Sequence, residues 1–285
     1  MPSAPICLFT DPENALNLKT VLVCADDFGL HCAVDAAIVE LAAHERLSAA
    51  GCLVDGPSFA EGAAALGASG LQCGLHLNFT EALGGEGVFM PLGRLIKACW
   101  ARRLDPAAVS RQIATQLDRY EMVMGRAPDY IDGHQHVHQF PQIREALLGE
   151  LDRRYPAGGP RPWLRSTRAG SQAGMALRLR LKAAIIALLG ARRHGCLARR
   201  HGYELNRALL GVYDFTGGAG GYACLLRAWL GAVHDGDLIM CHPAAGAVPG
   251  DPLGSQRRAE FDVWMSDEVG EWLQQLQLQI SRPVA

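Results

Sequence analysis

The chain has 285 residues, of which 49 % are hydrophobic and 20 % charged, and its formal net charge at pH 7 is −2. This composition is that of a globular protein, so it excludes an intrinsically disordered chain. The nearly balanced charge also gives no general attraction to nucleic acid. The length suits one large α/β domain, because barrel-type α/β domains commonly reach this size undivided.

The cysteines and the first residues predict a cytoplasmic enzyme. The nine cysteines are an odd number and form no C-x-x-C pair, so we expect reduced thiols, several of them buried, in a reducing compartment. The start of the chain lacks the basic region, long apolar core and cleavage site of a signal peptide. The longest apolar stretch, residues 183–191, is too short to cross a bilayer.

Residues 1–19 show no clear period and are expected to form an irregular lead-in. From residue 20 onward, short apolar runs alternate with helical patterns. Strands are predicted at residues 20–25, 49–54, 71–77, 128–133, 163–165, 209–213, 237–241 and 276–280. Helices are predicted at residues 33–44, 58–66, 106–124, 139–153, 175–200 (interrupted near Gly190 or Gly195), 222–233 and 257–275, with a glycine-rich loop at 84–93.

This alternation predicts the α/β class, with a (β/α)-barrel-like sheet of about seven mostly parallel strands and helical crossovers. We expect a single domain over residues 20–285, with a basic helical insertion at about 170–207.

Two adjacent carboxylates, Asp26 and Asp27, follow the first predicted strand in what is expected to be a turn. Open and barrel α/β folds place their chemistry at the carboxyl ends of strands. One aspartate could bind a metal while the other, on a different heading, works as a base. The alternative is that one caps the next helix and the other is solvated, and an isolated Asp-Asp pair favours this alternative.

Histidines follow three further predicted strands. His76 ends the strand at 71–77, a His-x-His-x-His segment begins at His134, and His242 follows the strand at 237–241. Singly, His76 and His242 would be ordinary core or loop histidines, whereas the triplet favours metal binding. In a barrel, however, all these strand ends meet on one face, so we expect one shared site.

Together, one or two aspartates and two histidines form a mixed nitrogen and oxygen donor set. Such a set suits Zn²⁺, and also Mn²⁺, Co²⁺ or Mg²⁺ with water completing the coordination. Three protein ligands would leave room for water and substrate. A free carboxylate beside the ion could take a proton from water, and a histidine across the cleft could protonate a leaving group.

Four segments in order, residues 25–29, 74–78, 132–138 and 240–243, resemble the signature blocks of the YdjC-like carbohydrate deacetylases. That family includes chitooligosaccharide deacetylases and deacetylases of hopanoid biosynthesis. The resemblance covers the chain from about residue 21 to 273. It implies a (β/α)-barrel-like fold, one divalent metal ion (Mg²⁺ or Zn²⁺ first, Mn²⁺ or Co²⁺ as alternatives) and removal of an acetyl group from an N-acetylated sugar, either small or lipid-linked.

The resemblance also implies roles for individual residues. The implied metal ligands are Asp27, His76 and His134. Asp26 would be the general base, His242 the general acid and Arg165 the residue that orients the base. Four further residues would line the substrate or support the ligands, namely Phe28, Asn78, His136 and His138. The sequence departs from the family at Cys24, where asparagine is more common, and this could alter a hydrogen bond behind Asp26.

Residues 161–207 carry eleven Arg or Lys and one acid, a net charge of +10, which leaves −12 for the rest. Within this segment a helical pattern places five apolar residues on one face, Leu177, Leu181, Ile185, Leu188 and Leu189. The first interpretation is a surface helix whose apolar stripe packs on the barrel while its arginines are solvated. The alternatives are contact with a membrane surface or an anionic lipid-linked sugar, and a homodimer contact. Nucleic acid is the least favoured partner, because no aromatic platform accompanies the charge.

Two other functions remain open from the sequence. A metallo-phosphoesterase of a histidinol-phosphatase-like barrel also uses clustered His and Asp, usually with more histidine ligands and two or three metal ions. A non-catalytic sugar- or lipid-binding protein is the other alternative.

Overall fold

The computed structural model describes residues 18–281. The predicted lead-in therefore lies outside the described residues, apart from Leu18 and Lys19, and Lys19 already begins the first strand. The strands are β1 (Lys19–Phe28), β2 (Ala49–Cys52), β3 (Gln72–Leu77), β4 (Tyr130–Gly133), β5 (Trp163–Leu164), β6 (Ala208–Leu210), β7 (Asp237–Cys241) and β8 (Leu278–Ile280). The helices are α1 (Cys32–Ala43), α2 (Phe59–Ala68), α3 (Leu92–Trp100), α4 (Pro106–Met124), α5 (Ile143–Arg154), α6 (Leu177–Leu188), α7 (Ala191–Arg200), α8 (Gly218–Gly231), α9 (Gln256–Met265) and α10 (Asp267–Gln275), with a 3₁₀ helix η2 (His134–Gln139).

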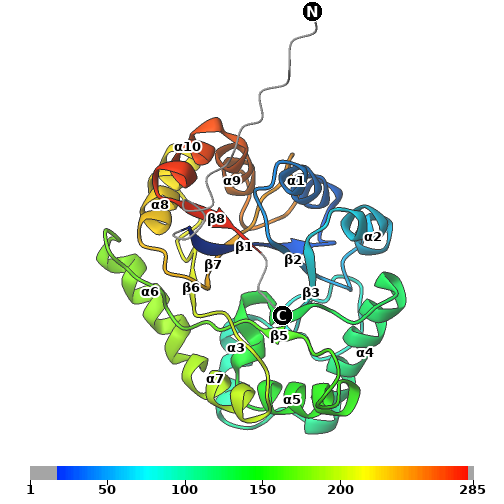
Figure 1. Ribbon diagram of the computed structural model, residues 1–285. Coiled ribbons are helices and arrows are strands. Elements are labelled where there is room, and N and C mark those ends of the chain that lie inside the picture. Colours follow the sequence, from blue (N-terminus) through cyan, green and yellow to red (C-terminus); the bar gives the residue numbers. More distant parts are fainter. Residues whose placement is uncertain (1–17, 282–285) are drawn as a thin grey trace, which may run out of the picture.

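The strands form one curled parallel sheet in the order β5-β4-β3-β2-β1-β7-β6, with β8 paired to β1. Isolated parallel bridges join Leu164 to Leu205 and Ala169 to Leu209, so the sheet comes close to closing between β5 and β6. Helices surround the curled sheet (Figure 1). The predicted α/β class and the barrel-like parallel sheet are confirmed.

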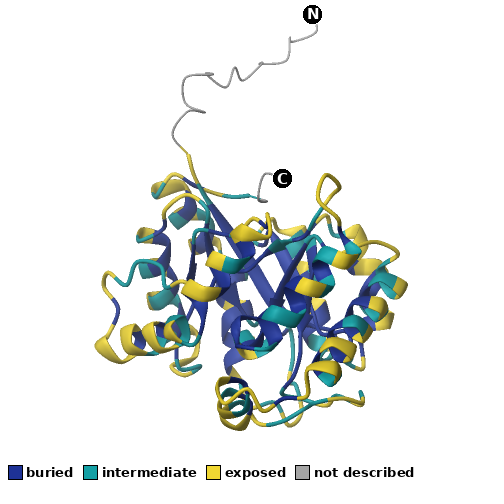
Figure 2. Ribbon diagram, turned by 90° about the horizontal axis from the view of Figure 1, so that it is seen from below, coloured by how far each residue is buried: buried dark blue, intermediate teal, exposed yellow. Residues whose placement is uncertain are grey.

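The strands are buried on both faces, which explains their continuous apolar sequences. β1, for example, is buried from Val21 to Phe28. The surrounding helices bury the side that faces the sheet and expose the other side, as the buried centre and exposed rim of Figure 2 show. α4 follows the predicted pattern closely, since Asp105 caps its start by accepting from the Ala107 amide and Gly125 ends it at φ 67°.

The structure differs from the predicted elements in three main places. β1 does not end before the aspartates but runs through them to Phe28, with an irregularity in its pairing to β2 between Ala25 and Phe28. Asp27 takes a left-handed φ of 72° there. The helix predicted at 257–275 is broken at Ser266, and α3 was not predicted at all.

The predicted 175–200 helix breaks at Gly190, which is one of the two positions where an interruption was predicted. Gly190 has φ 156°, and a Cβ there would collide with the Gln139 carbonyl oxygen, so the chain bends where it crosses the end of η2. Most of the apolar stripe of this segment does not pack on the barrel as first interpreted: four of its five residues are exposed, and only Leu189 packs against the core. α6 buries Leu179 and Ala183 instead. Apolar residues form stripes on two sides of this helix, and the sequence period alone does not tell which stripe is buried.

Candidate active site

A cavity of about 1110 Å³ opens at the carboxyl ends of the parallel strands. Six predicted site residues line it, namely Asp26, Asp27, His76, His134, His136 and His242. They come from β1, β3, the residue directly after β7 and the 3₁₀ helix after β4, which the parallel sheet brings to one edge. The expectation that these strand ends share one site therefore agrees with the geometry.

Asp27, His76 and His134 can each offer one donor atom within 4.8 Å of the others. The Asp27 Oδ1 atom lies 3.5 Å from His76 Nε2 and 3.0 Å from His134 Nδ1. The other carboxylate oxygen, Oδ2, accepts from Arg257 Nη2 at 2.8 Å. One oxygen is thus held by an arginine and the other faces two imidazole nitrogens. Two nitrogens and one oxygen at this spacing fit a divalent metal ion.

Asp132, at the end of β4, fixes the orientation of His76. The Nδ1 atom of His76 donates to Asp132 Oδ1 at 2.7 Å, so Nε2 is left free to face Asp27. A carboxylate behind the second ring nitrogen is a common support for a metal-binding histidine. The sequence analysis gave Asp132 no role, although it lies in one of the four signature segments.

His134 is placed between two carboxylates, because its Nε2 atom lies 3.2 Å from Glu81 Oε1. Burial alone would lower the pKa of His134, but Asp27 and Glu81 outweigh it and raise that pKa to about 10. For Asp27, burial raises the pKa, yet Arg257 and His134 hold it well below its usual range. The site therefore favours a positive charge beside an ionised Asp27.

Asp26 has a different partner from its neighbour. Arg165 donates to both of its oxygens, from Nη1 at 2.7 Å and from Nη2 at 2.6 Å. Burial would raise the pKa of Asp26, but the Arg165 guanidinium, with help from His76, holds it well below its usual range. Asp26 is thus ionised and fixed in orientation, which is what the predicted role of Arg165 requires.

A second donor group, Cys24, Asp26 and Asp132, is already filled by a side chain. Arg165 Nη2 lies 2.9 Å from Cys24 Sγ and 2.6 Å from Asp132 Oδ2. A guanidinium at this point leaves no room for a metal ion. Cys24 does lie behind Asp26, 3.5 Å from its Oδ1 atom, as the departure from the family pattern led us to expect.

His242 lies directly after β7 and faces Asp26, with its Nε2 atom 3.9 Å from Asp26 Oδ2. Its backbone amide donates to Glu260 Oε2 at 2.6 Å, and the Tyr213 hydroxyl donates to Glu260 Oε1 at 2.5 Å. Burial lowers the pKa of His242 to about 4, so the ring is neutral at pH 7. Burial also raises the pKa of Glu260 to about 7.

The four supporting residues fall into different places. His136 lines the cavity, and burial together with Arg165 lowers its pKa to about 3. His138 lies behind the site and donates from Nε2 to the Arg165 carbonyl oxygen at 3.0 Å. Asn78 holds the loop of Glu81, since its side chain accepts from the amides of Thr80 and Glu81.

The prediction that Phe28 lines the substrate or supports the ligands was wrong. Its side chain does not line the cavity but is fully buried in the core, against Gly62 of α2.

Sequence reasoning missed Asp132, Glu81, Arg257 and Glu260. Arg257 comes from α9, 230 positions from Asp27, and is held by Asp251 as well, with Nε donating to Oδ2 at 2.5 Å. No local pattern marks such a residue. Asp132 and Glu81 carried a weak signal, because Asp132 stands two residues before His134 and Glu81 five residues after His76.

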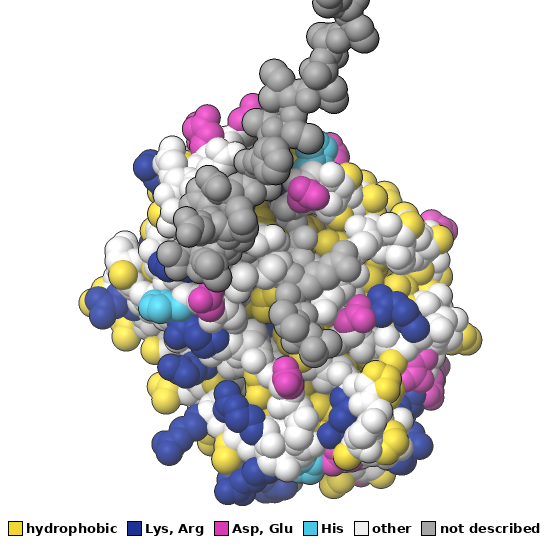
Figure 3. All heavy atoms as spheres, viewed as in Figure 1, with side chains coloured by type: hydrophobic (Ala, Val, Ile, Leu, Met, Phe, Trp, Pro, Cys, Tyr) yellow, Lys and Arg dark blue, Asp and Glu magenta, His cyan; other side chains and the backbone are white. Residues whose placement is uncertain are grey.

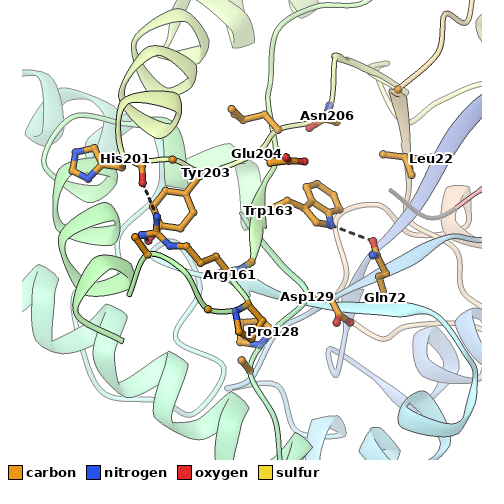
Figure 4. A pocket seen from close by; sticks show the side chains of 18 of the residues that line it. Leu22, Gln72, Pro128, Asp129, Arg161, Trp163, His201, Tyr203, Glu204 and Asn206 are labelled. Carbon is orange, nitrogen blue, oxygen red and sulfur yellow. Dashed lines mark hydrogen bonds between the residues drawn. The ribbon is translucent and has the colours of Figure 1, made fainter. Parts of the chain in front are cut away.

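A second cavity, of about 1190 Å³, lies at the amino ends of the strands (Figure 4). Some of its polar groups are paired with each other: Trp163 Nε1 donates to Gln72 Oε1 at 3.1 Å, and Arg161 donates to the His201 carbonyl at 2.6 Å and to the Tyr203 hydroxyl. None of the predicted site residues lines it.

Among residues 18–281, no helix combines the length and the apolar character that crossing a membrane requires.

Known proteins resemble this chain in sequence. An Escherichia fergusonii protein named chitooligosaccharide deacetylase is 34 % identical over 134 residues, which cover 44 % of this chain and 52 % of that protein. A Homo sapiens protein named carbohydrate deacetylase is 30 % identical over 144 residues, which cover 46 % of this chain and 45 % of that protein. The match therefore spans about half the length of these two relatives. A Salmonella paratyphi B chitooligosaccharide deacetylase is 27 % identical over 241 residues, 79 % of this chain and 82 % of that protein.

The fold has a counterpart among solved structures and the sequence matches a family model. A protein of Enterococcus faecalis V583, described as a candidate cellobiose-phosphate cleavage protein, superposes with a TM-score of 0.67 at 20 % identity, covering 93 % of this chain and 98 % of that one. At that identity the likeness concerns the fold alone. The model of the YdjC-like protein family matches residues 20–275. This chain is a member of the YdjC-like family.

Proposed function

We propose that the protein is a divalent-metal-dependent hydrolase that removes the N-acetyl group from an N-acetylated amino sugar and releases acetate. The observation that carries the proposal is the division of labour between two neighbouring carboxylates. Asp27 faces two imidazole nitrogens, whereas Asp26, 3.9 Å from His242, is held by Arg165. The deacetylase names of the relatives support the same reaction.

The residues that would hold the ion are Asp27, His76 and His134. Their two imidazole nitrogens favour Zn²⁺, with Mn²⁺, Co²⁺ and Mg²⁺ as alternatives. A divalent ion held there would polarise the amide carbonyl and acidify the attacking water, so that a carboxylate with as low a pKa as Asp26 can accept the proton.

The other residues would manage protons and orientation. Asp26 takes one proton from water as the oxygen attacks the carbonyl carbon. The amide C–N bond then breaks, and the leaving nitrogen needs one proton to become an amine. His242 is neutral at pH 7 and lies beside Asp26, so it can pass that proton across the cleft. Acetate and the free amine are the products, and no further reactant is needed.

The cavity volume of about 1110 Å³ lies just above the usual range for small-molecule sites, roughly 300–1,000 Å³. Part of its wall is apolar, including Leu92 and Ile96 of α3 and Leu189 after α6. These features support a substrate larger than one sugar ring, either an oligosaccharide or an amino sugar joined to an apolar group.

A metallo-phosphoesterase with two or three metal ions fits less well. In the part of the chain that the structure describes, the only other donor group contains the Arg165 guanidinium. A measured stoichiometry of one metal ion per chain would agree with the proposed hydrolase.

The test is acetate release by metal-free protein reloaded with Zn²⁺, Mn²⁺, Co²⁺ or Mg²⁺ in turn. The substrates are diacetylchitobiose and a lipid-linked N-acetylglucosamine. We expect release that a chelator abolishes and metal restores, and almost none from His134→Ala. Full activity of His134→Ala, or no acetate from any substrate with any metal, would overturn the proposal.

A further inference from the structure

Helix α6 presents an apolar stripe to solvent beside the active-site cavity. Seven large apolar side chains are exposed among the described residues, and four of them lie on this one helix. The exposed fractions are 67 % for Leu177, 55 % for Leu181, 58 % for Ile185 and 78 % for Leu188. Their spacing places them on one helix face. A contiguous exposed stripe of this kind marks a surface that meets an apolar partner.

The opposite side of α6 is anchored, so the stripe is not a packing face that has turned outward by chance. Leu179 and Ala183 are buried there. Lys182 Nζ donates to the Tyr213 carbonyl at 2.5 Å, and Arg178 pairs with Asp214 at 3.3 Å. These contacts fix the rotation of the helix about its own axis.

The charge around the stripe selects the kind of partner. Arg180 on α6 and Arg192 and Arg193 on α7 are exposed. Dark-blue side chains gather at the lower left of Figure 3, where Figure 1 places α6 and α7. Residues 177–200, which form α6 and α7, carry seven Arg or Lys and no acid. A partner that is both apolar and anionic is the surface of a membrane with acidic lipids.

The stripe is continuous with the cavity, since Leu181 and Ile185 belong to both. A surface that covers the stripe would therefore lie at the mouth of the cavity that holds Asp26 and Asp27.

We propose that α6 docks the protein on an anionic lipid surface, with the stripe among the lipid chains and the arginines near the headgroups. The helix has 12 residues and is about 18 Å long, so it lies in the interface and does not cross it. The further consequence, that the cavity meets an amino sugar presented by a lipid at that surface, rests on the proposed function. The docking itself does not.

The experiment is co-sedimentation of the full chain with vesicles of phosphatidylcholine alone or mixed with phosphatidylglycerol. We expect binding to the mixed vesicles that weakens as salt is added. The test variant is Leu177→Gln with Leu188→Gln, because neither residue lines the cavity. Loss of two leucines that would enter the lipid should weaken binding by about tenfold or more. The matched control is Trp100→Gln with Met122→Gln, which removes two exposed apolar side chains from α3 and α4 and should bind like wild type.

Acetate release from diacetylchitobiose separates this proposal from the proposed function, since the Leu177→Gln, Leu188→Gln variant should keep it. Absence of acetate would count against the hydrolase and leave the vesicle result standing. Wild-type protein that ignores anionic vesicles, or a variant that binds them as tightly as wild type, would overturn the docking. So would a wild-type dimer, seen by analytical ultracentrifugation, that the variant loses while neither protein binds vesicles.

Discussion

The two ends of the barrel hold cavities of nearly the same volume, about 1110 Å³ at the carboxyl ends and about 1190 Å³ at the amino ends. They differ in how deeply their connected titratable groups are buried. At the carboxyl ends, the fully buried Asp132 contacts His76 and Arg165, which in turn contact Asp27 and Asp26. At the amino ends, Arg161, His201 and Tyr203 also share one carboxylate, but that residue, Asp152, is half-exposed, as is His201. A buried network of titratable groups, and not volume, therefore marks the candidate active site.

Among the substitutions at the two ends of the barrel, removal of Arg165 should have the largest effect on stability and turnover. The Arg165→Met substitution leaves Asp26 and Asp132 buried without their cation, and an uncompensated buried charge costs about 3–5 kcal/mol. We expect that loss in the free energy of unfolding measured in urea, together with loss of turnover. Arg165→Lys keeps the charge and should recover part of the stability. A stability loss below about 1 kcal/mol in Arg165→Met would mean that Asp26 and Asp132 do not depend on Arg165 for their stability.

The Asp132→Asn substitution should weaken metal binding by about 10–100-fold, because His76 loses the carboxylate that orients its Nε2 atom. Isothermal titration with Zn²⁺ measures this directly. Asp129→Asn is the matched control, since Asp129 lies just before the same strand at the opposite end of the barrel. Equal Zn²⁺ affinities in Asp132→Asn and wild type would show that Asp132 does not support metal binding by His76.

The pH dependence of stability should also reflect the carboxyl end. Burial raises the pKa of Glu260 from the usual 4.5 to about 7, so the folded state keeps its proton to higher pH than the unfolded state. Stability from this group is therefore lost as pH rises from about 4.5 to 7, by up to about 3 kcal/mol. We expect the free energy of unfolding of wild type, measured in urea, to fall by this amount between pH 4 and pH 8 relative to Glu260→Gln. The same pH dependence of the unfolding free energy in wild type and Glu260→Gln would contradict the raised pKa of Glu260.

The smallest effect is expected at the amino end. Arg161 pairs with the half-exposed Asp152 and lies over the Tyr203 ring, so Arg161→Met should cost about 1 kcal/mol or less of stability. Acetate release should stay within about twofold of wild type. A large loss of turnover in this variant would break the distinction between the two ends.

The sequence predicted the parts of the molecule that depend on local pattern. Apolar runs marked the strands, and parallel strands bring Asp26, His76, His134 and His242 to one edge. Two features depend on packing instead. Arg257 reaches Asp27 from a helix far along the chain, and α6 could have buried either of two apolar stripes. Asp132 was visible in its signature segment, but its role depends on which ring nitrogen of His76 faces the cavity.

The central claim is that neighbouring aspartates do different work, and one paired measurement tests it. Metal content and acetate release are determined together for Asp26→Asn and Asp27→Asn, both reloaded with Zn²⁺. We expect Asp26→Asn to hold one ion per chain but to lose turnover by about 10²–10⁴-fold. We expect Asp27→Asn to bind the ion weakly. Loss of metal in Asp26→Asn with full retention in Asp27→Asn would contradict the claim.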